Sequence, residues 1–169
     1  MGPLSIGTDG GGSVRIPCSF SGLFGIKPTF GKIPAWPLSP YGTIANLGPM
    51  ARSVLDGAML FSVISSPDWR DWHADTQMDS DFISRLSEGI RGKKIAYCPD
   101  FGMTYAMKPN VIQPDVSKTV KNTVKLLEDS GAEVDQIEIK WASDPKKAFH
   151  ILWTSGAAFL SPGPCRSSG

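Results

Sequence analysis

The chain has 169 residues, enough for one domain with a hydrophobic core and too few for two domains of ordinary size. Its formal net charge of +1 excludes strong electrostatic attraction to nucleic acid or to an anionic membrane, so neither is expected as a partner. Three widely spaced cysteines and the lack of a membrane span or signal pattern predict a cytoplasmic protein with no disulfide framework, zinc site or other metal site.

Residues 1–50 differ in composition from the rest of the chain. They hold ten of the 18 glycines and seven of the 14 prolines, but only four of the charged side chains. Leu, Ile, Phe and Trp are frequent in the same segment, which is typical of buried, irregular backbone and not of a disordered tail. We therefore expect this segment to be wrapped by more polypeptide than the 169 residues supply, with the fold incomplete at the N-terminus.

The first half is predicted to alternate short regular elements with loops. In chain order we expect a strand over 4–8, a glycine run over 10–12, a brief helix over 13–20 with Ser13 as its N-cap, a buried strand over 24–28 and a long loop over 31–48.

The second half has the periodicity of a helix and strand repeat. The expected elements are a helix over 53–64 with Ser53 as its N-cap, a polar loop over 65–81, a strand over 94–98, a helix over 113–130, a strand over 134–139 and a helix over 144–159. This order predicts an α/β fold in one partial domain over 1–160, followed by a tail over 161–169. Residues 1–81 would form the glycine-rich core and residues 92–160 a βαβα segment.

The glycine run after the first strand is the candidate site. A phosphate-binding P-loop would need a lysine between Gly12 and Ser13, and a dinucleotide fingerprint or a hydrolase elbow would need glycine at Arg15. Two interpretations remain. By spacing alone, a tight turn capped by Ser13 is favoured over a nest of N–H groups that stabilises an oxyanion while Ser13 attacks a carbonyl.

A longer motif resembles a known family. Residues 7–17 read Gly-Thr-Asp-Gly-Gly-Gly-Ser-Val-Arg-Ile-Pro and residues 20–29 read Phe-Ser-Gly-Leu-Phe-Gly-Ile-Lys-Pro-Thr. Both strings are similar to the core motifs of the amidase signature family, and Gly-Pro-Met-Ala-Arg-Ser-Val at 48–54 extends the similarity. The resemblance is specific over residues 2–71 and covers 92–160 only in the order of elements.

The resemblance implies a function and a set of site residues. It implies hydrolysis of the C–N bond of a small-molecule carboxamide through an acyl-enzyme, with no cofactor. Its nucleophile falls on Ser13, its oxyanion hole on Gly10, Gly11 and Gly12 together with Ser13, and its structural support on Asp9 and Arg15. It also implies part of a mixed-sheet α/β core with helices packed on both faces, and is compatible with a homodimer of the parent enzyme.

The chain departs from the family pattern before the nucleophile. In this family a second serine, held by a cis peptide, and a lysine further upstream deprotonate the nucleophile. The residues before Ser13 contain Ser5 and no lysine, while Lys27 and Lys32 follow Ser13 and match other family positions. The isolated chain is therefore expected to have little or no activity, because losing a member of such a set costs roughly 10⁴ to 10⁶ in rate.

Two other functions are compatible with these residues. One is the glutamine-hydrolysing component of an aminoacyl-tRNA transamidation complex, ranked second because residues 35–40, Ala-Trp-Pro-Leu-Ser-Pro, look more like those of stand-alone amidases. The other is a non-catalytic, truncated remnant that folds poorly alone and binds another chain through exposed strand edges.

Overall fold

A computed structural model describes residues 2–76, 81–102 and 112–160 of the chain. The chain divides into two compact units, one formed by 1–87 with 149–169 and the other by 88–148. The first unit contains β1 (Leu4–Asp9), α1 (Arg15–Ser21), β2 (Phe24–Gly25), η1 (Gly42–Ile44), β3 (Asn46–Ala51), α2 (Val54–Ile64) and η2 (Ser84–Ser87). The second contains β4 (Lys94–Tyr97), α3 (Pro114–Asp129) and β5 (Glu133–Gln136), and α4 (Pro145–Leu160) begins in it and continues into the first.

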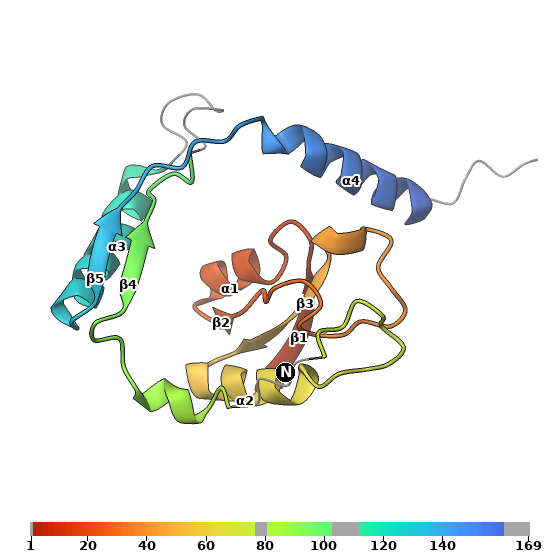
Figure 1. Cartoon of the computed structure of the whole chain (residues 1–169), viewed down its shortest axis with the longest axis horizontal. Helices are drawn as coiled ribbons and strands as arrows, with labels where there is room; N and C mark the ends of the chain where they lie inside the picture. The colour runs from red at the N-terminus through yellow and green to blue at the C-terminus, as the bar shows by residue number, and fades with distance from the viewer. Residues whose placement is uncertain (1, 77–80, 103–111, 161–169) are drawn as a thin grey trace, which may run out of the picture. The chain divides into compact units, whose positions relative to one another are not determined.

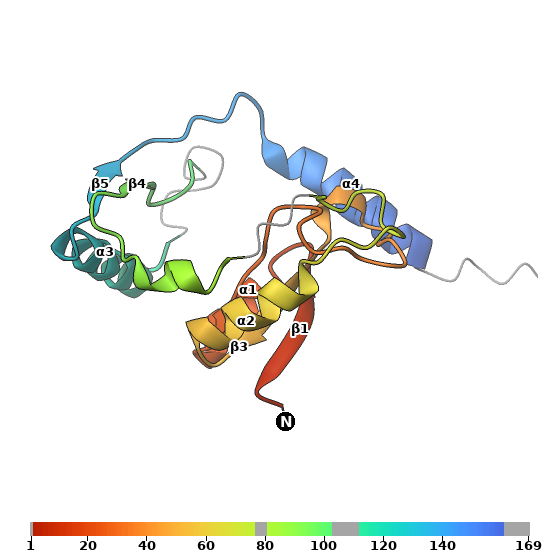
Figure 2. The same ribbon diagram turned by 60° about the horizontal axis from the view of Figure 1, so that its bottom comes forward.

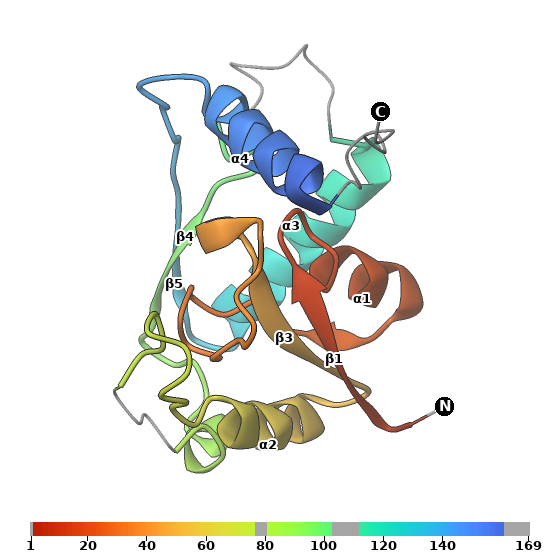
Figure 3. The same ribbon diagram turned by 90° about the vertical axis from the view of Figure 1, so that its right-hand side faces the viewer.

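The first unit is built on a three-stranded antiparallel sheet of order β1-β3-β2 (Figures 1 and 3). β1 and β3 pair along their whole length, from Leu4 opposite Ala51 to Asp9 opposite Asn46. The sheet therefore ends at Asp9, directly before the glycine run. Within the described residues β1 is an edge strand, so its outer backbone groups have no strand partner there.

The central strand β3 corrects the prediction of a long loop over 31–48. Its sequence contains Gly48 and Pro49, and both residues ordinarily argue against a central strand. Pro49 is nevertheless fully buried, and its carbonyl accepts a hydrogen bond from the N–H of Ile26 at 3.2 Å. A Cβ on Gly48 would collide with the Ile26 carbonyl oxygen, so the close approach of these two segments requires glycine there. The predicted strand over 24–28 is correspondingly short, since only β2 is regular.

The two helices of the first unit begin differently. The predicted Ser13 cap of α1 is wrong, because Val14 occupies the N-cap position and its side chain makes no capping hydrogen bond. The prediction for α2 is confirmed: Ser53 is its N-cap, and the Ser53 hydroxyl accepts a hydrogen bond from the Asp56 N–H at 3.1 Å. The same hydroxyl donates to the Asp56 carboxylate at 2.7 Å, so two hydrogen bonds between Ser53 and Asp56 stabilise the first turn of α2.

α2 packs on the sheet through small residues and one aromatic ring. Gly57, Ala58 and Phe61 are buried, and a Cβ on Gly57 would collide with the ring of Phe24 in β2. The opposite side of α2 carries an apolar stripe that is at least half exposed, formed by Leu55, Met59 and Val63. A helix that is apolar on both sides is typical of one covered on both sides.

The second unit pairs β4 and β5 in parallel (Figure 1), and α3 connects them in the chain (Figure 2). The predicted order of strand, helix and strand is confirmed, although β5 ends at Gln136 and not at residue 139. With the sheet of the first unit, this unit makes the fold α/β as predicted. The predicted tail over 161–169 lies outside the described residues. Among the helices that the structure describes, none is long and apolar enough to span a membrane.

Replacing Ser53 by alanine tests the cap of α2. The S53A variant loses the acceptor for the Asp56 N–H, and we expect its free energy of unfolding to fall by about 1 kcal/mol. Urea denaturation followed by circular dichroism measures this change. The control is Ser66→Ala, which lies beyond the helix and is expected to leave the midpoint unchanged; equal midpoints for the two variants would contradict the assignment of the cap.

Candidate active site

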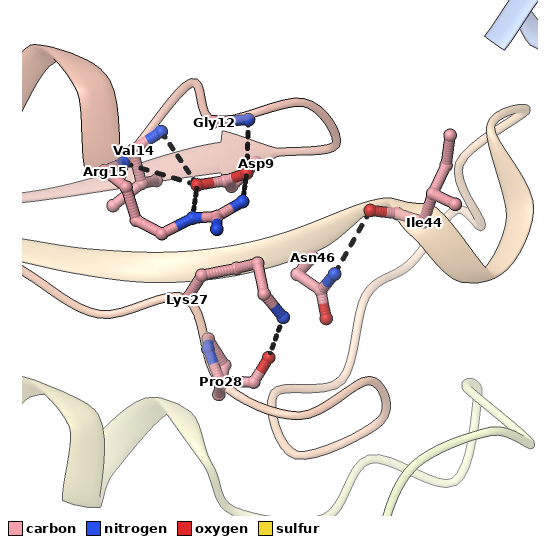
Figure 4. Close-up of polar contacts among 8 residues, drawn as sticks. All are labelled: Asp9, Gly12, Val14, Arg15, Lys27, Pro28, Ile44 and Asn46. Carbon is pink, nitrogen blue, oxygen red and sulfur yellow. Dashed lines mark hydrogen bonds and ion pairs between the residues drawn. The ribbon is translucent and has the colours of Figure 1, made fainter. Parts of the chain in front are cut away.

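The glycine run is held by the carboxylate of Asp9, the last residue of β1 (Figure 4). Asp9 is 0% exposed, so its negative charge must be compensated inside the protein. Its carboxylate accepts hydrogen bonds from the backbone N–H of Gly12 at 2.7 Å and from those of Val14 and Arg15 at 3.3 Å each. The chain therefore turns around this one carboxylate as it leaves the strand and enters α1.

Arg15 completes the cluster. Its Nε and Nη2 each donate to one oxygen of Asp9 at 2.9 Å, in a bidentate pair. The Arg15 guanidinium is the main reason why the pKa of Asp9 lies well below its ordinary value; burial opposes this shift and the backbone N–H groups reinforce it. The same pair raises the pKa of Arg15. Asp9 and Arg15, predicted as structural support, do lie together.

The predicted oxyanion donors divide into two groups. The N–H of Gly12 is used by Asp9, and Gly12 adopts a φ of +116°, which favours glycine. Within the described part of the chain, the N–H groups of Gly10, Gly11 and Ser13 have no hydrogen-bond partner. Among the described residues, three N–H groups of the loop are thus open to a ligand, while the others shape the loop.

Ser13 is exposed at the turn between this loop and α1, and its hydroxyl has no partner among the described residues. The nearby lysines are directed elsewhere. Lys27 Nζ donates to the Pro28 carbonyl at 2.5 Å (Figure 4), and Lys32 Nζ pairs with the Asp75 carboxylate at 3.2 Å. No His, Cys, Asp or Glu side chains gather as a set of three or more metal ligands in the described ranges.

Aromatic residues of α4 lie directly against the glycine loop, which the sequence analysis missed. A Cβ on Gly10 or Gly11 would lie 3.3 or 3.5 Å from the Trp153 ring, and one on Gly11 would lie 3.5 Å from the Phe149 ring. Trp153 also packs on Tyr41 with ring centroids 4.8 Å apart. Phe149 and Trp153 are four residues apart and so share one helix face, but the sequence did not indicate which surface that face meets.

The structure thus brings together a buried carboxylate, a glycine-rich loop folded around it and an exposed serine at the end of a strand in an α/β fold. The chain belongs to the amidase family, whose family model, Amidase, matches residues 1–161. The resemblance found in the glycine-rich motifs is thereby confirmed and extends over nearly the whole chain.

Curated relatives are similar in sequence but much longer. The chain is 33% identical over 157 residues to a glutamyl-tRNA(Gln) amidotransferase subunit of Lactiplantibacillus plantarum, covering 92% of this chain and 31% of the relative. It is 35% identical over 151 residues to the corresponding subunit from Clostridium botulinum, covering 89% of this chain and 30% of that one. The chain thus spans about a third of the length of these relatives.

Solved structures of the family share the fold. A bacterial aryl acylamidase of the amidase signature family matches 94% of this chain and 31% of its own length, with a TM-score of 0.77 and 26% identity. The glutamyl-tRNA(Gln) amidotransferase subunit from Thermotoga maritima matches 99% of this chain and 35% of its own, with a TM-score of 0.74 and 29% identity.

Replacing Asp9 by asparagine tests the cluster. The amide group of asparagine would bring N–H donors against N–H donors, so we expect D9N to lose about 1–3 kcal/mol of stability near pH 7. Because the pKa of Asp9 is lowered from 3.8 in the folded chain, its stabilisation is complete above that value and is lost as the pH falls through the folded-state pKa.

Denaturation of wild type and D9N at several acidic pH values measures this difference, which should shrink as the pH falls. The matched control is Asp68→Asn, because Asp68 forms a similar bidentate pair with Arg70 but on the exposed surface. The control variant should change stability little. A constant gap between wild type and D9N across the pH series would contradict the role of the Asp9 charge.

Proposed function

We propose that this chain carries the nucleophile and the oxyanion hole of an amide hydrolase that acts on a small-molecule carboxamide. The Ser13 Oγ attacks the carbonyl carbon, and the carbonyl oxygen becomes an oxyanion. The C–N bond then breaks, the nitrogen takes up the proton that the Ser13 hydroxyl gave up and leaves as ammonia or an amine, and Ser13 holds the acyl group as an ester. Water hydrolyses the ester, releases the carboxylic acid and restores the serine hydroxyl.

The observation that carries this proposal is the set of open N–H groups, among the described residues, beside an exposed serine. Gly10, Gly11 and Ser13 supply N–H donors, whereas Gly12 contributes the bend and its bond to Asp9. Each preorganised donor of this kind lowers a barrier of acyl transfer by about 3 kcal/mol. Asp9 and Arg15 act as positioning residues, since both are engaged with each other and the loop backbone.

The proton acceptor for Ser13 is the second element of the mechanism. The structure pairs Lys27 and Lys32 with other groups, and no described side chain accepts a hydrogen bond from Ser13. We propose the serine and lysine of the family pattern as the relay; the stretch before Ser13 in these 169 residues contains Ser5 and no lysine. In the proposed mechanism the oxyanion hole comes from residues 10–13, and neither Lys27 nor Lys32 serves as the base.

Labelling with a fluorophosphonate tests whether Ser13 is activated in this chain. We expect Ser13 of the purified 169-residue chain to be labelled at least roughly 10⁴-fold more slowly than the nucleophile of a family member that contains the complete relay, because the Ser13 hydroxyl is not activated. Intact-mass spectrometry over time measures the labelling rate. Ser13→Ala gives the background labelling, and Ser19→Ala, at another exposed serine, is the matched control that should leave the rate unchanged. Rapid stoichiometric labelling of Ser13 in the wild-type chain would overturn the assignment of the missing base.

A second candidate is glutamine hydrolysis within an amidotransferase, favoured by the names of the curated relatives. The substrate would then be glutamine, and the ammonia would pass to a partner protein. Ammonia release from glutamine, measured with and without the partner subunits of a relative's complex, separates the two functions. We expect no stimulation by the partners; release that depends on them would reverse the order of the two candidates.

A further inference from the structure

The peptide group between Gly10 and Gly11 is the part of the glycine loop that Asp9 does not hold. Its N–H belongs to Gly11 and its carbonyl to Gly10, and neither has a hydrogen-bond partner among the described residues. The next N–H along the chain, that of Gly12, is bound to the Asp9 carboxylate at 2.7 Å. Glycine on both sides allows a peptide group to rotate through conformations that other residues exclude. A fixed direction for the Gly11 N–H therefore requires a contact from outside residues 9–15.

The helix α4 supplies such a contact, because it runs beside the loop between β1 and α1 (Figures 1 and 3). A Cβ on Gly10 would lie 3.3 Å from Cζ3 of the Trp153 ring, and one on Gly11 would lie 3.5 Å from the same atom. The ring thus stands where side chains at both positions would be, against the two Cα atoms that flank the unbonded peptide group. Turning this peptide group toward the ring would place its carbonyl oxygen in a crowded apolar space that offers it no hydrogen bond.

The Trp153 ring is itself held by aromatic partners. It stacks on Phe149 of the same helix with ring centroids 5.6 Å apart, and it packs on Tyr41 with ring centroids 4.8 Å apart. Gly156 is buried one turn further along α4, and a Cβ there would collide with the Tyr41 ring. The close approach of α4 to Tyr41 therefore requires glycine at position 156, and it brings Trp153 within reach of the loop.

We propose that Trp153 is a positioning residue of the oxyanion hole, whose ring keeps the peptide group between Gly10 and Gly11 in the orientation that presents the Gly11 N–H to the oxyanion. This inference rests on the proposed function. Asp9 fixes the end of the loop next to α1 through a local contact, and Trp153 fixes the beginning of the loop through a distant one. Since a preorganised donor stabilises an oxyanion only when it points at it, the second support bears directly on the rate of attack by Ser13.

Backbone ¹⁵N relaxation of the 169-residue chain tests the positioning without requiring catalysis. For the wild type we expect order parameters of about 0.85 at Gly10 and Gly11, the value of a rigid backbone, and Trp153→Ala should lower both below about 0.6. Trp153→Phe keeps a ring at this position and should preserve most of the order. The matched control is Phe159→Ala, which removes a ring from the same helix at a residue that is 79% exposed and should change neither value. Gly12, bound to Asp9, should stay ordered in every variant.

The relaxation measurement has outcomes that would overturn the proposal. Equal order at Gly10 and Gly11 in W153A and in the wild type is one of them, and low order in the wild type itself is another. A loss of order at Gly12 as large as that at the other two glycines is a third, because it would indicate general loosening of the unit. If W153A does not fold, Gly156→Ala displaces Tyr41 and with it Trp153; unchanged order in this variant would equally contradict the proposal.

Fluorophosphonate labelling of Ser13 measures the effect on the reaction. The serine oxygen bonds to phosphorus, fluoride leaves, the hydroxyl proton passes to solvent, and the charge that develops on the phosphoryl oxygen calls on the same N–H donors. We expect W153A to be labelled about tenfold more slowly than the wild type, and W153F and F159A at nearly the wild-type rate. Rescue by phenylalanine distinguishes support of the loop from a general loss of stability.

The two measurements separate this inference from the proposed function. A loosened loop with an unchanged labelling rate would overturn the role of Trp153 in the oxyanion hole. A loosened loop in W153A, together with failure of the serine at this position to acylate in a complete family member, would refute the proposed function and not the support of the loop by Trp153.

Discussion

The buried carboxylate of Asp9 is the constraint on which the rest of the site depends. A charge that is 0% exposed is stable only with strong partners, and the chain supplies three backbone N–H groups and a bidentate arginine within six residues. These partners can meet the carboxylate only if the backbone turns back at Gly12. The shape of the loop is therefore held by contacts among residues 9–15 at the end of β1.

Because the Asp9 carboxylate binds part of the loop backbone, the N–H groups of the loop fall into two sets. Those of Gly12, Val14 and Arg15 point at Asp9, and those of Gly10, Gly11 and Ser13 are left over among the described residues. The positive φ at position 12 favours glycine, whereas Gly10 and Gly11 lie against aromatic rings of α4, where a Cβ would be 3.3 and 3.5 Å from the Trp153 ring. Of the three adjacent glycines, Gly12 is thus the one whose backbone conformation favours glycine.

The sequence predicted what depends on local contacts and missed what depends on distant ones. The motif placed Asp9 and Arg15 together, and the spacing from Ser53 to Asp56 predicted α2 and its cap. β3 was not predicted because Gly48 and Pro49 are poor strand residues whose cost is offset only by burial between two partners. The contact of Trp153 with the loop, and the bond from Ala35 to Asp71, join segments whose meeting no local pattern encodes.

The same distinction between local and distant contacts divides the proposed catalytic groups. The proposed oxyanion hole and nucleophile lie within residues 9–15, where the Asp9 carboxylate binds the loop backbone and Arg15. Residues 9–15 do not supply the proton acceptor for Ser13 in the proposed mechanism, so this group must come from another part of the fold. The charge-poor composition of residues 1–50 and the exposed apolar stripe of α2 are both features of an interior, in a chain that spans about a third of its relatives. In the proposed function, oxyanion binding and activation of the serine therefore depend on different parts of the fold, and residues 9–15 would supply the first.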